Sequence, residues 1–323
     1  MKTIQTIKDI YIKPGKRVNY KLPLAKLPDG TNIFMPIIIA QGEQDGPTLL
    51  LTSLIHGIEI GGYDTIIKVF NRLNIRKMRG RIVGIPIVNP LAFNVANRFT
   101  PQDSVDLNRI FPGDIAGTIS QRIAYILSHH VAKHVDFVID FHSCNPPSEF
   151  FTIVTDEGNQ NVRDISWKMA EAFGAFTVSP SFETPGTFSN YLVKIDKPSI
   201  TPELVFSRRF DASSQIGVTG TFNVMKYLNM IDGDYERLPN TRPFNKEYSY
   251  TVCNANTGGF IYFRKNIGSQ IKKGDVLADI KDAWGEQVTQ VKSPVTGLII
   301  AYPMAGNQAV MTGDKIAYIA YKK

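Results

Sequence analysis

The sequence contains two cysteines among 323 residues, Cys144 and Cys253, and they lie far apart. That number argues against a disulfide framework, and the spacing is not that of a cysteine metal site, so a reducing cytoplasm is the expected setting. No apolar run approaches the roughly 18 residues of a membrane-spanning helix, and no membrane partner is expected. Residues 1–17 carry charge but no apolar core, which argues against a secretory signal.

The sequence also lacks clustered charge. Lysines and arginines number 36 against 29 aspartates and glutamates, a formal net charge of +7, but they contain no basic run of five or six residues. A nucleic-acid surface needs a basic stripe with interleaved aromatic residues, so no nucleic-acid partner is expected. The excess positive charge suits an acidic substrate, but the even distribution of lysines and arginines along the sequence is typical of an ordinary soluble protein.

From about residue 35 to 232, short apolar runs alternate with segments of helical period. Several of the runs are rich in β-branched residues, which is typical of strands buried on both faces. The expected strands are 34–40, 48–55, 81–88, 137–141, 151–154 and 199–204, and the expected helices are 59–73, 119–133, 163–173 and 217–230. This alternation predicts an α/β fold with a mostly parallel or mixed sheet flanked by helices, in a first domain that covers residues 1–235 and includes the N-terminal strands of residues 1–40.

The C-terminal part has a different pattern of apolar residues and glycines. After a polar linker at 232–243, residues 246–323 contain short apolar segments and glycine turns, which predicts a smaller all-β domain. The segment 273–280 returns as 312–319, and 312 minus 273 gives an offset of 39 residues. Such a repeat predicts two similar halves related by a pseudo-twofold axis, and it resembles the biotinyl/lipoyl-type barrel. The hairpin tip 282–286 has no carrier lysine, so we expect a structural cap instead of a swinging arm.

A histidine and a glutamate follow the apolar strand that ends near residue 55. His56 and Glu59 lie three residues apart at a strand-to-helix turn, where both can face one metal ion. Imidazole nitrogen and carboxylate oxygen bind zinc at about 2.0–2.2 Å, and open α/β sheets bind ligands at the carboxyl ends of their strands. The same residues also fit a helix-capping turn with a surface glutamate, because H-x-x-E arises by chance.

A catalytic zinc needs a third protein ligand and an open position. Three histidines fall on or just after a predicted amphipathic helix and are expected at the surface or at the end of that helix: His129, His130 and His134. His142 instead ends the buried run 135–141, so it would complete a site with His56 and Glu59 at the same sheet edge. Asp140 shares a strand face with His142, and it either orients the imidazole or caps the next loop.

A proline-flanked loop carries the segment Asp106-Leu107-Asn108-Arg109. Asn108 and Arg109 together can bind a carboxylate, the guanidinium in a bidentate manner and the amide through one further hydrogen bond. Arg98 in the same loop can stabilise the negative oxygen that forms during amide hydrolysis. A simple ion pair between Asp106 and Arg109 would also account for these residues.

In this order and spacing, the motifs resemble the aspartoacylase/succinylglutamate desuccinylase family: H-x-x-E after a strand, an arginine, D-L-N-R-x-F, and D-x-H at a strand end. The resemblance covers about residues 35–232, and the C-terminal domain is similar to that of longer bacterial members such as the N-acetyl-diaminobutyrate deacetylases. It implies a zinc carboxypeptidase-like fold with a smaller C-terminal barrel-like domain that caps the site.

The resemblance also implies residue roles. His56, Glu59 and His142 would hold one zinc ion per chain, Arg98 would polarise the scissile carbonyl, and Asn108 with Arg109 would bind the substrate carboxylate. The family's general base lies in a pattern T-x-E-L-G or T-x-E-x-G at the end of a later strand, which assigns Glu203. Val205 stands where a glycine is common, and valine resists backbone angles that glycine permits.

The implied function is zinc-dependent hydrolysis of the linear amide of a small N-acyl amino acid, with a metal-activated water and a glutamate base. The sequence contains no G-x-S-x-G elbow, the motif that would indicate a covalent intermediate. The alternatives are a metallocarboxypeptidase, which would need an open groove, and a non-catalytic binding homologue. Specificity is expected from loops 145–150 and 180–190 and from the cap, where one of the 13 tyrosines could join the pocket. The sequence leaves the oligomeric state open, and a homo-oligomer is compatible with it.

Overall fold

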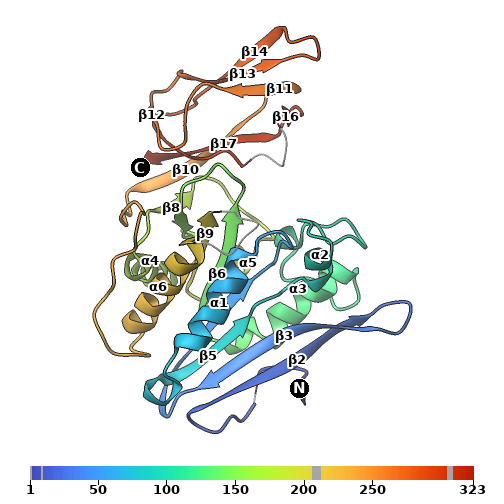
Figure 1. Cartoon of the computed structure of the whole chain (residues 1–323), viewed down its shortest axis with the longest axis vertical. Helices are drawn as coiled ribbons and strands as arrows, with labels where there is room; N and C mark the ends of the chain where they lie inside the picture. Colours follow the sequence, from blue (N-terminus) through green and yellow to red (C-terminus); the bar gives the residue numbers. More distant parts are fainter. Residues whose placement is uncertain (1, 9, 206–211, 304–307) are drawn as a thin grey trace.

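The computed structural model describes residues 2–8, 10–205, 212–303 and 308–323. A mixed sheet with helices on both faces forms the larger part, which we call the body, and the C-terminal strands form the cap beside one end of it (Figure 1). The order of strands in the main sheet is β1-β2-β3-β5-β4-β6-β9-β7-β8-β10-β17-β15-β12. Among the described residues, no helix combines the length and apolar character that crossing a membrane requires.

The centre of the body sheet is parallel. Strand β4 (Gln44–Ser53) lies between β5 (Arg79–Ile85) and β6 (Phe137–Cys144), and β6 pairs with β9 (Ser199–Val205), all in parallel. The remaining body strands are β1 (Lys2–Thr3), β2 (Lys16–Lys26), β3 (Asn32–Gln41), β7 (Phe151–Ile153) and β8 (Thr177–Pro180). Because β5, β4, β6 and β9 run the same way, their carboxyl ends meet at one edge of the sheet.

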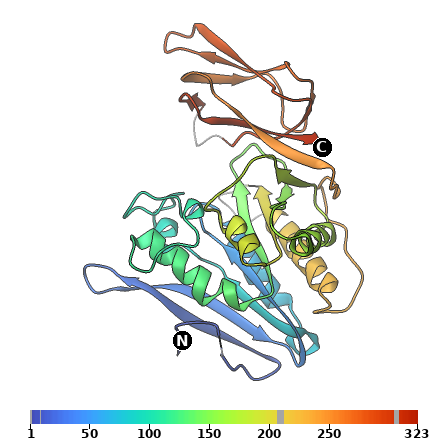
Figure 2. The same ribbon diagram turned by 180° about the vertical axis from the view of Figure 1, so that it is seen from behind.

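The central strands are buried on both faces, as their apolar runs predict. Leu50 packs into a core that includes residues of α3 (Ile119–His130) and α5 (Phe188–Lys194). Leu49 and Leu51 pack on the opposite face, with residues of α1 (Gly61–Arg72), α4 (Gln160–Phe173) and α6 (Ala212–Tyr227). Figure 2 shows the face that α3 and α5 cover. All three leucines are completely buried, so side chains alternate between two cores along one strand.

The six strands and four helices predicted for the body are confirmed, with ends that shift by a few residues. The prediction placed N-terminal strands within residues 1–40, where β2 lies, but gave no bounds for it, and it did not specify β8 or the short helices α2 (Pro90–Asn94) and α5. Helix α5 lies in a region that was expected to be a loop. His129 and His130 end α3 and His134 follows it, as the helix-end alternative predicts, and all three are half-buried.

The repeat in the cap is confirmed at the level of strands. Each strand of the first half has a counterpart 38 or 39 residues later: β10 (Tyr248–Asn254), β11 (Gly259–Phe263), β12 (Gln270–Ile271) and β13 (Val276–Lys281) match β14 (Gln287–Lys292), β15 (Gly297–Ala301), β16 (Ala309–Val310) and β17 (Lys315–Lys322). The two layers, β10-β17-β15-β12 and β14-β13-β11-β16, have the same order once counterparts are exchanged. Each half therefore contributes two strands to each layer, around one shared core.

Body and cap are joined by hydrogen-bonded strands. β10 pairs in parallel with β8, with Tyr250 opposite Pro180. A small core at the junction contains Val178 from the body and Leu298 and Ile300 from the cap. The division into domains 1–235 and 246–323 stays a prediction, because one sheet runs through both parts.

Candidate metal centre and substrate pocket

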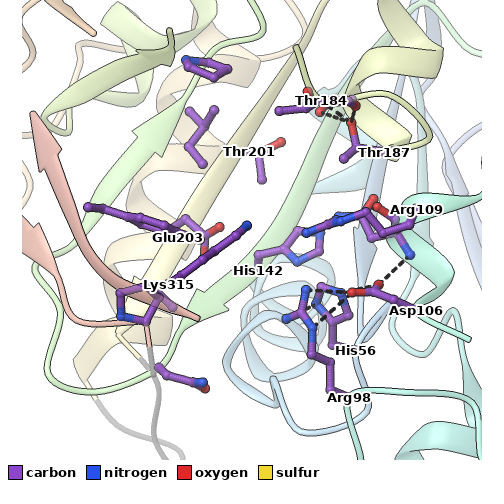
Figure 3. A pocket seen from close by; sticks show the side chains of 18 of the residues that line it. His56, Arg98, Asp106, Arg109, His142, Thr184, Thr187, Thr201, Glu203 and Lys315 are labelled. Atoms are coloured by element: carbon purple, nitrogen blue, oxygen red, sulfur yellow. Dashed lines mark hydrogen bonds and ion pairs between the residues drawn. The ribbon is translucent and has the colours of Figure 1, made fainter. Parts of the chain in front are cut away.

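The two predicted histidines meet at the carboxyl edge of the sheet (Figure 3). Strand β4 ends at Ser53, and His56 follows in the turn that leads to α1, whereas His142 lies on β6, the parallel neighbour of β4. Gly57 makes the turn possible, because a Cβ there would lie 2.1 Å from the backbone of Ala92. The centroids of the two imidazole rings are 5.0 Å apart.

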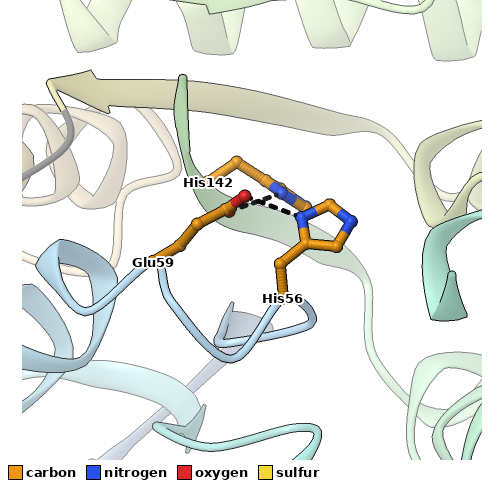
Figure 4. A group of neighbouring side chains, drawn as sticks. All are labelled: His56, Glu59 and His142. Carbon is orange, nitrogen blue, oxygen red and sulfur yellow. Dashed lines mark hydrogen bonds and ion pairs between the residues drawn. The ribbon is translucent and has the colours of Figure 1, made fainter. Parts of the chain in front are cut away.

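Glu59 lies between the two imidazoles (Figure 4). Its Oε1 is 2.7 Å from Nδ1 of His56, and its Oε2 is 3.0 Å from Nδ1 of His142. One ligand atom from each of the three buried residues lies within 4.8 Å of the others. Burial opposes ionisation of the carboxyl, but the two imidazoles outweigh it and lower the pKa of Glu59. The helix-capping alternative, with Glu59 at the surface, is therefore wrong.

The second ring nitrogen of each imidazole, Nε2, also contacts a carboxylate. Nε2 of His56 is 3.1 Å from Oδ1 of Asp106, and Nε2 of His142 is 2.9 Å from Oδ2 of Asp140. Asp140 is fixed in turn by the Thr52 hydroxyl, which donates to Oδ1 at 2.7 Å. Contacts of this kind fix the tautomer and direction of metal-binding histidines. Of the two interpretations of Asp140, the structure supports the one in which it orients the imidazole.

Arg98 lies beside the same group of ligand atoms. Its Nη1 is 3.4 Å from Nδ1 of His56 and 3.7 Å from Oε1 of Glu59, and its Nη2 is 3.0 Å from Oδ2 of Asp106. The histidine and the guanidinium lower the pKa of Asp106 despite its partial burial. The expected alternative of an ion pair between Asp106 and Arg109 is not what the structure shows, since Asp106 pairs with Arg98.

Asn108 and Arg109 reach the pocket from the short helix η2 (Leu107–Arg109). Oδ1 of Asn108 accepts a hydrogen bond from the backbone N–H of Phe188 at 2.8 Å, which leaves its amide N–H groups to donate. Gly186 packs against this turn with a φ of 74°, and a Cβ there would lie 2.0 Å from the carbonyl oxygen of Arg109. The tight contact fixes the direction from which Arg109 enters the pocket.

Glu203 stands on β9, next to the three candidate metal ligands. It pairs in register with His142 on β6, and burial raises its pKa to about 7. Val205 is the last residue of β9 and pairs with Cys144, so its backbone is extended and no positive φ is required. The concern raised by a valine in a glycine position is thereby removed for the strand itself.

One cavity of about 660 Å³ is lined by the candidate ligands and the polar residues around them: His56, Glu59, Arg98, Asp106, Asn108, Arg109, Asp140, His142 and Glu203. Of the two loops expected to set specificity, residues 145–150 contribute Asn145, and residues 180–190 contribute Pro180, Phe182, Glu183, Thr184, Pro185, Thr187 and Ser189. The cap contributes Tyr250, Pro303, Ala309, Val310, Asp314, Lys315 and Tyr318. The sequence could not single out Tyr250 and Tyr318, because their place depends on the pairing of β8 with β10. The one sequence signal that could have indicated them is that both tyrosines lie in strands of the predicted repeat.

Comparison with known proteins places the chain in a family. Residues 45–228 match the model of the succinylglutamate desuccinylase/aspartoacylase catalytic domain. This segment is more than half of the chain and contains His56, Glu59, His142 and Glu203. The chain therefore belongs to the succinylglutamate desuccinylase/aspartoacylase family.

Particular relatives resemble nearly the whole chain. An N-alpha-acetyl-L-2,4-diaminobutyric acid deacetylase from Halomonas elongata is 26% identical over 302 residues, which is 89% of this chain and 86% of the relative. A succinylglutamate desuccinylase/aspartoacylase from Rhodobacter sphaeroides superimposes with a TM-score of 0.87, at 24% identity over 99% of each chain. The product-bound ectoine utilization protein EutE (DoeB) from Ruegeria pomeroyi superimposes with a TM-score of 0.86, at 21% identity over 98% of each chain. These two solved structures share the fold of the body and the cap together.

Proposed function

We propose that this protein is a zinc-dependent amidohydrolase that removes the acyl group from an N-acyl amino acid. The observation that carries the proposal is the convergence of His56, Glu59 and His142 on one point, with the carboxylate of Glu203 on the adjacent strand. Membership of the desuccinylase/aspartoacylase family and the likeness to a deacetylase support the same class of reaction.

The residues present fit a zinc ion. Two imidazole nitrogens and one carboxylate are a donor set that suits zinc, and Asp106 and Asp140 hold both rings with Nδ1 turned toward Glu59. Zinc held by His56, Glu59 and His142 would lower the pKa of a water molecule and polarise the scissile carbonyl.

The protein's own groups supply the remaining chemistry. Glu203 accepts a proton from the attacking water, whose oxygen bonds to the carbonyl carbon, and it returns that proton to the amide nitrogen as the C–N bond breaks. The Arg98 guanidinium donates hydrogen bonds to the carbonyl oxygen as that atom becomes negative. Arg109 and the amide of Asn108 bind the carboxylate of the amino acid and so fix the position of the amide bond.

The shape of the pocket favours an acyl amino acid over a peptide. Residues of the cap, among them Tyr250, Lys315 and Tyr318, form one wall of the cavity, and its volume of about 660 Å³ lies in the usual range for small-molecule sites. A carboxypeptidase would need an open groove for the rest of the peptide. The Halomonas elongata relative is named for a deacetylation, and we extend that class of reaction, but not its particular substrate, to this chain.

The test is a panel of N-acyl amino acids given to the zinc-loaded protein, in which the acyl group and the amino acid are varied separately. We expect release of a free amine from at least one member, and no release of C-terminal residues from longer peptides. Zinc content is measured on the same sample. Peptide cleavage without deacylation would favour the carboxypeptidase, and no turnover with zinc bound would favour a non-catalytic binding protein.

A further inference from the structure

One side of the pocket is lined by hydroxyl groups. We call these residues the hydroxyl wall: Thr155, Thr184, Thr187, Ser189 and Thr201. In Figure 3, the labelled threonines of this wall lie on one side of His142, and Arg98 lies on the other. The wall is built by β9, by the segment that follows β7, and by the first turn of α5 with the loop before it. It therefore belongs to the body.

The hydroxyl wall lies beside the residues that would bind the amino acid half of the substrate. The backbone N–H of Phe188 donates to Asn108, and Gly186 packs against the carbonyl oxygen of Arg109, so residues 184–189 are fixed against this turn. If Arg109 binds the carboxylate of the amino acid, as the proposed function requires, the side chain of that amino acid lies next to the wall, because both groups are bonded to the same carbon atom. The wall therefore bears on the choice of amino acid.

Three hydroxyls of the wall are used by the turn that begins α5. The Thr187 hydroxyl donates to the carbonyl oxygen of Thr184 at 2.9 Å and accepts from the backbone N–H of Asn190 at 3.2 Å. Its oxygen also lies 3.3 Å from the Ser189 hydroxyl and 3.5 Å from that of Thr184. These contacts cap the helix, so the three residues give the wall its shape and polarity while their hydrogen bonds stay within the protein.

Thr155 and Thr201 differ, because neither hydroxyl has a hydrogen-bond partner among the residues that the structure describes. Both residues are buried, with 4% and 8% of their surface exposed. Thr201 lies two residues before Glu203 on β9, so both side chains are on one face of the strand, about 6.6 Å apart along it. Thr201 pairs with Ile153, and Thr155 follows two residues later. Buried polar groups without partners are unfavourable, so a bound molecule that hydrogen-bonds to both would complete the site.

The hydroxyl wall offers no charge of its own to an ionised side chain. Nearby, Asp140 orients its histidine, and Glu157 accepts a hydrogen bond from α5 at 2.7 Å. Glu183 precedes the wall but is exposed, so solvent screens its charge. Glu203 and Arg109 have roles in the proposed reaction. A carboxylate or ammonium at the wall would lose hydration that hydroxyls replace only in part, and an alkyl group would leave both free hydroxyls unpaired.

We infer that Thr155 and Thr201 are specificity-determining residues, which hydrogen-bond to an uncharged polar side chain on the amino acid half of the substrate. The inference rests on the proposed function and names the substrate class: an N-acyl amino acid whose side chain carries a carboxamide or a hydroxyl. Such a group both donates and accepts hydrogen bonds, as the two threonine hydroxyls do. The selection of the amino acid is then made by the body of the protein.

Compounds of similar shape separate this preference from a preference for charge or for hydrocarbon. The acyl group is kept as acetyl, and the amino acid is varied in two series: asparagine, aspartate and leucine, and glutamine, glutamate and methionine. N-acetyl-L-threonine and N-acetyl-L-valine compare a hydroxyl with a methyl group, and N-α-acetyl-L-2,4-diaminobutyrate supplies a cation. Turnover by the zinc-loaded protein gives kcat and KM for each compound, and calorimetric titration of the free amino acids gives Kd.

Three variants connect the preference to the two hydroxyls. The double variant Thr155→Val/Thr201→Val replaces each hydroxyl by a methyl group of similar size, and valine suits extended backbone. Thr152→Val is the matched control, because the Thr152 hydroxyl on β7 is also buried without a partner but lies outside the pocket. Thr155→Ser/Thr201→Ser keeps both hydroxyls and should keep the preference. If the valine double variant does not fold, the single variants Thr155→Val and Thr201→Val take its place.

In the wild type, we expect kcat/KM for the carboxamide or hydroxyl compound to exceed that of its charged and alkyl counterparts by about tenfold or more in at least one series. The valine double variant should reduce the preference over the alkyl compound to about threefold or less, while Thr152→Val keeps it. Equal values within every series, or a preference for a charged or an alkyl compound, would overturn the inference, as would a carboxamide or hydroxyl preference that the valine double variant leaves unchanged. Absence of hydrolysis for every compound would instead reject the proposed reaction, and the calorimetric comparison of free amino acids would still decide the role of the two threonines.

Discussion

The body and the cap contribute to one pocket in different ways. In the body, His56 and His142 are each held between Glu59 and a second carboxylate, so their directions are fixed before any ligand arrives. In the cap, Lys315 and Tyr318 face the pocket without a hydrogen bond or ion pair from their polar ends to any residue that the structure describes. On the proposed function, the groups that would take part in the reaction are held by neighbouring side chains, whereas the cap groups that would contact the substrate are left to pair with it.

Removal of the metal should have the largest effect and would locate the reaction in the body. After dialysis against a chelator, we expect activity to fall by about 100-fold or more, and stoichiometric Zn²⁺ should restore it. His142→Asn should bind zinc much more weakly, as measured by metal analysis, because one of three ligands is lost. His129→Asn is the matched control. Full activity in metal-free protein would contradict the proposed centre.

Loss of the base should have the next largest effect. Glu203→Gln keeps the shape of the side chain but cannot accept a proton, so kcat should fall by about 10²–10⁴-fold while zinc content is unchanged. Glu286→Gln, at an exposed position in the cap, serves as the control. A variant at position 203 with normal kcat would remove this residue from the role of base.

Loss of the carboxylate-binding arginine should weaken substrate binding more than it slows the reaction. In Arg109→Met, we expect KM for an N-acyl amino acid to rise by about 10-fold or more, since a charge-assisted hydrogen bond contributes about 1.5–3 kcal/mol. The KM for the corresponding amino acid amide, which lacks the carboxylate, should change little. An equal rise for both compounds would indicate that the arginine acts on the shape of the pocket and not on the carboxylate.

The smallest effect is expected in the cap. Tyr318→Phe removes a hydroxyl but keeps the ring that packs against Tyr250, with centroids 5.3 Å apart. We expect kcat/KM to change by about tenfold or less, in line with the loss of one hydrogen bond to substrate. A fall as large as that of Glu203→Gln would contradict the division of labour between body and cap.

The sequence predicts the metal centre better than the surrounding pocket, for a physical reason. His56 and His142 each follow a long buried strand, and parallel strands bring their carboxyl ends to the same edge whatever the loops do. Asp106 is 50 residues from His56, in a loop with no periodic pattern, so its contact with the imidazole could not be predicted from spacing. Whether a valine is tolerated at position 205 could not be predicted from the sequence either, because its extended backbone depends on pairing with Cys144 on the neighbouring strand.

Long-range contacts that the sequence does not predict matter even more in the cap. Its strands could be predicted from the 39-residue repeat, but the repeat does not say which copy faces the body. That is decided by the pairing of β8 with β10, whose residues Ser179 and Ser249 are 70 positions apart. Tyr250, Lys315 and Tyr318 therefore became site residues only once this long-range pairing was known.

The junction between β8 and β10 has a consequence for how substrate reaches the metal. Swinging the cap away would break the ladder at Ser249 and Tyr250 and would expose Leu298 and Ile300 to water, which is unfavourable. On the proposed function, substrate and product would exchange with this junction intact, past Phe99 and Phe182, two pocket-lining residues that are 44% and 37% exposed. Side chains at that rim would then set which small molecules can enter while the pairing of β8 with β10 stays intact.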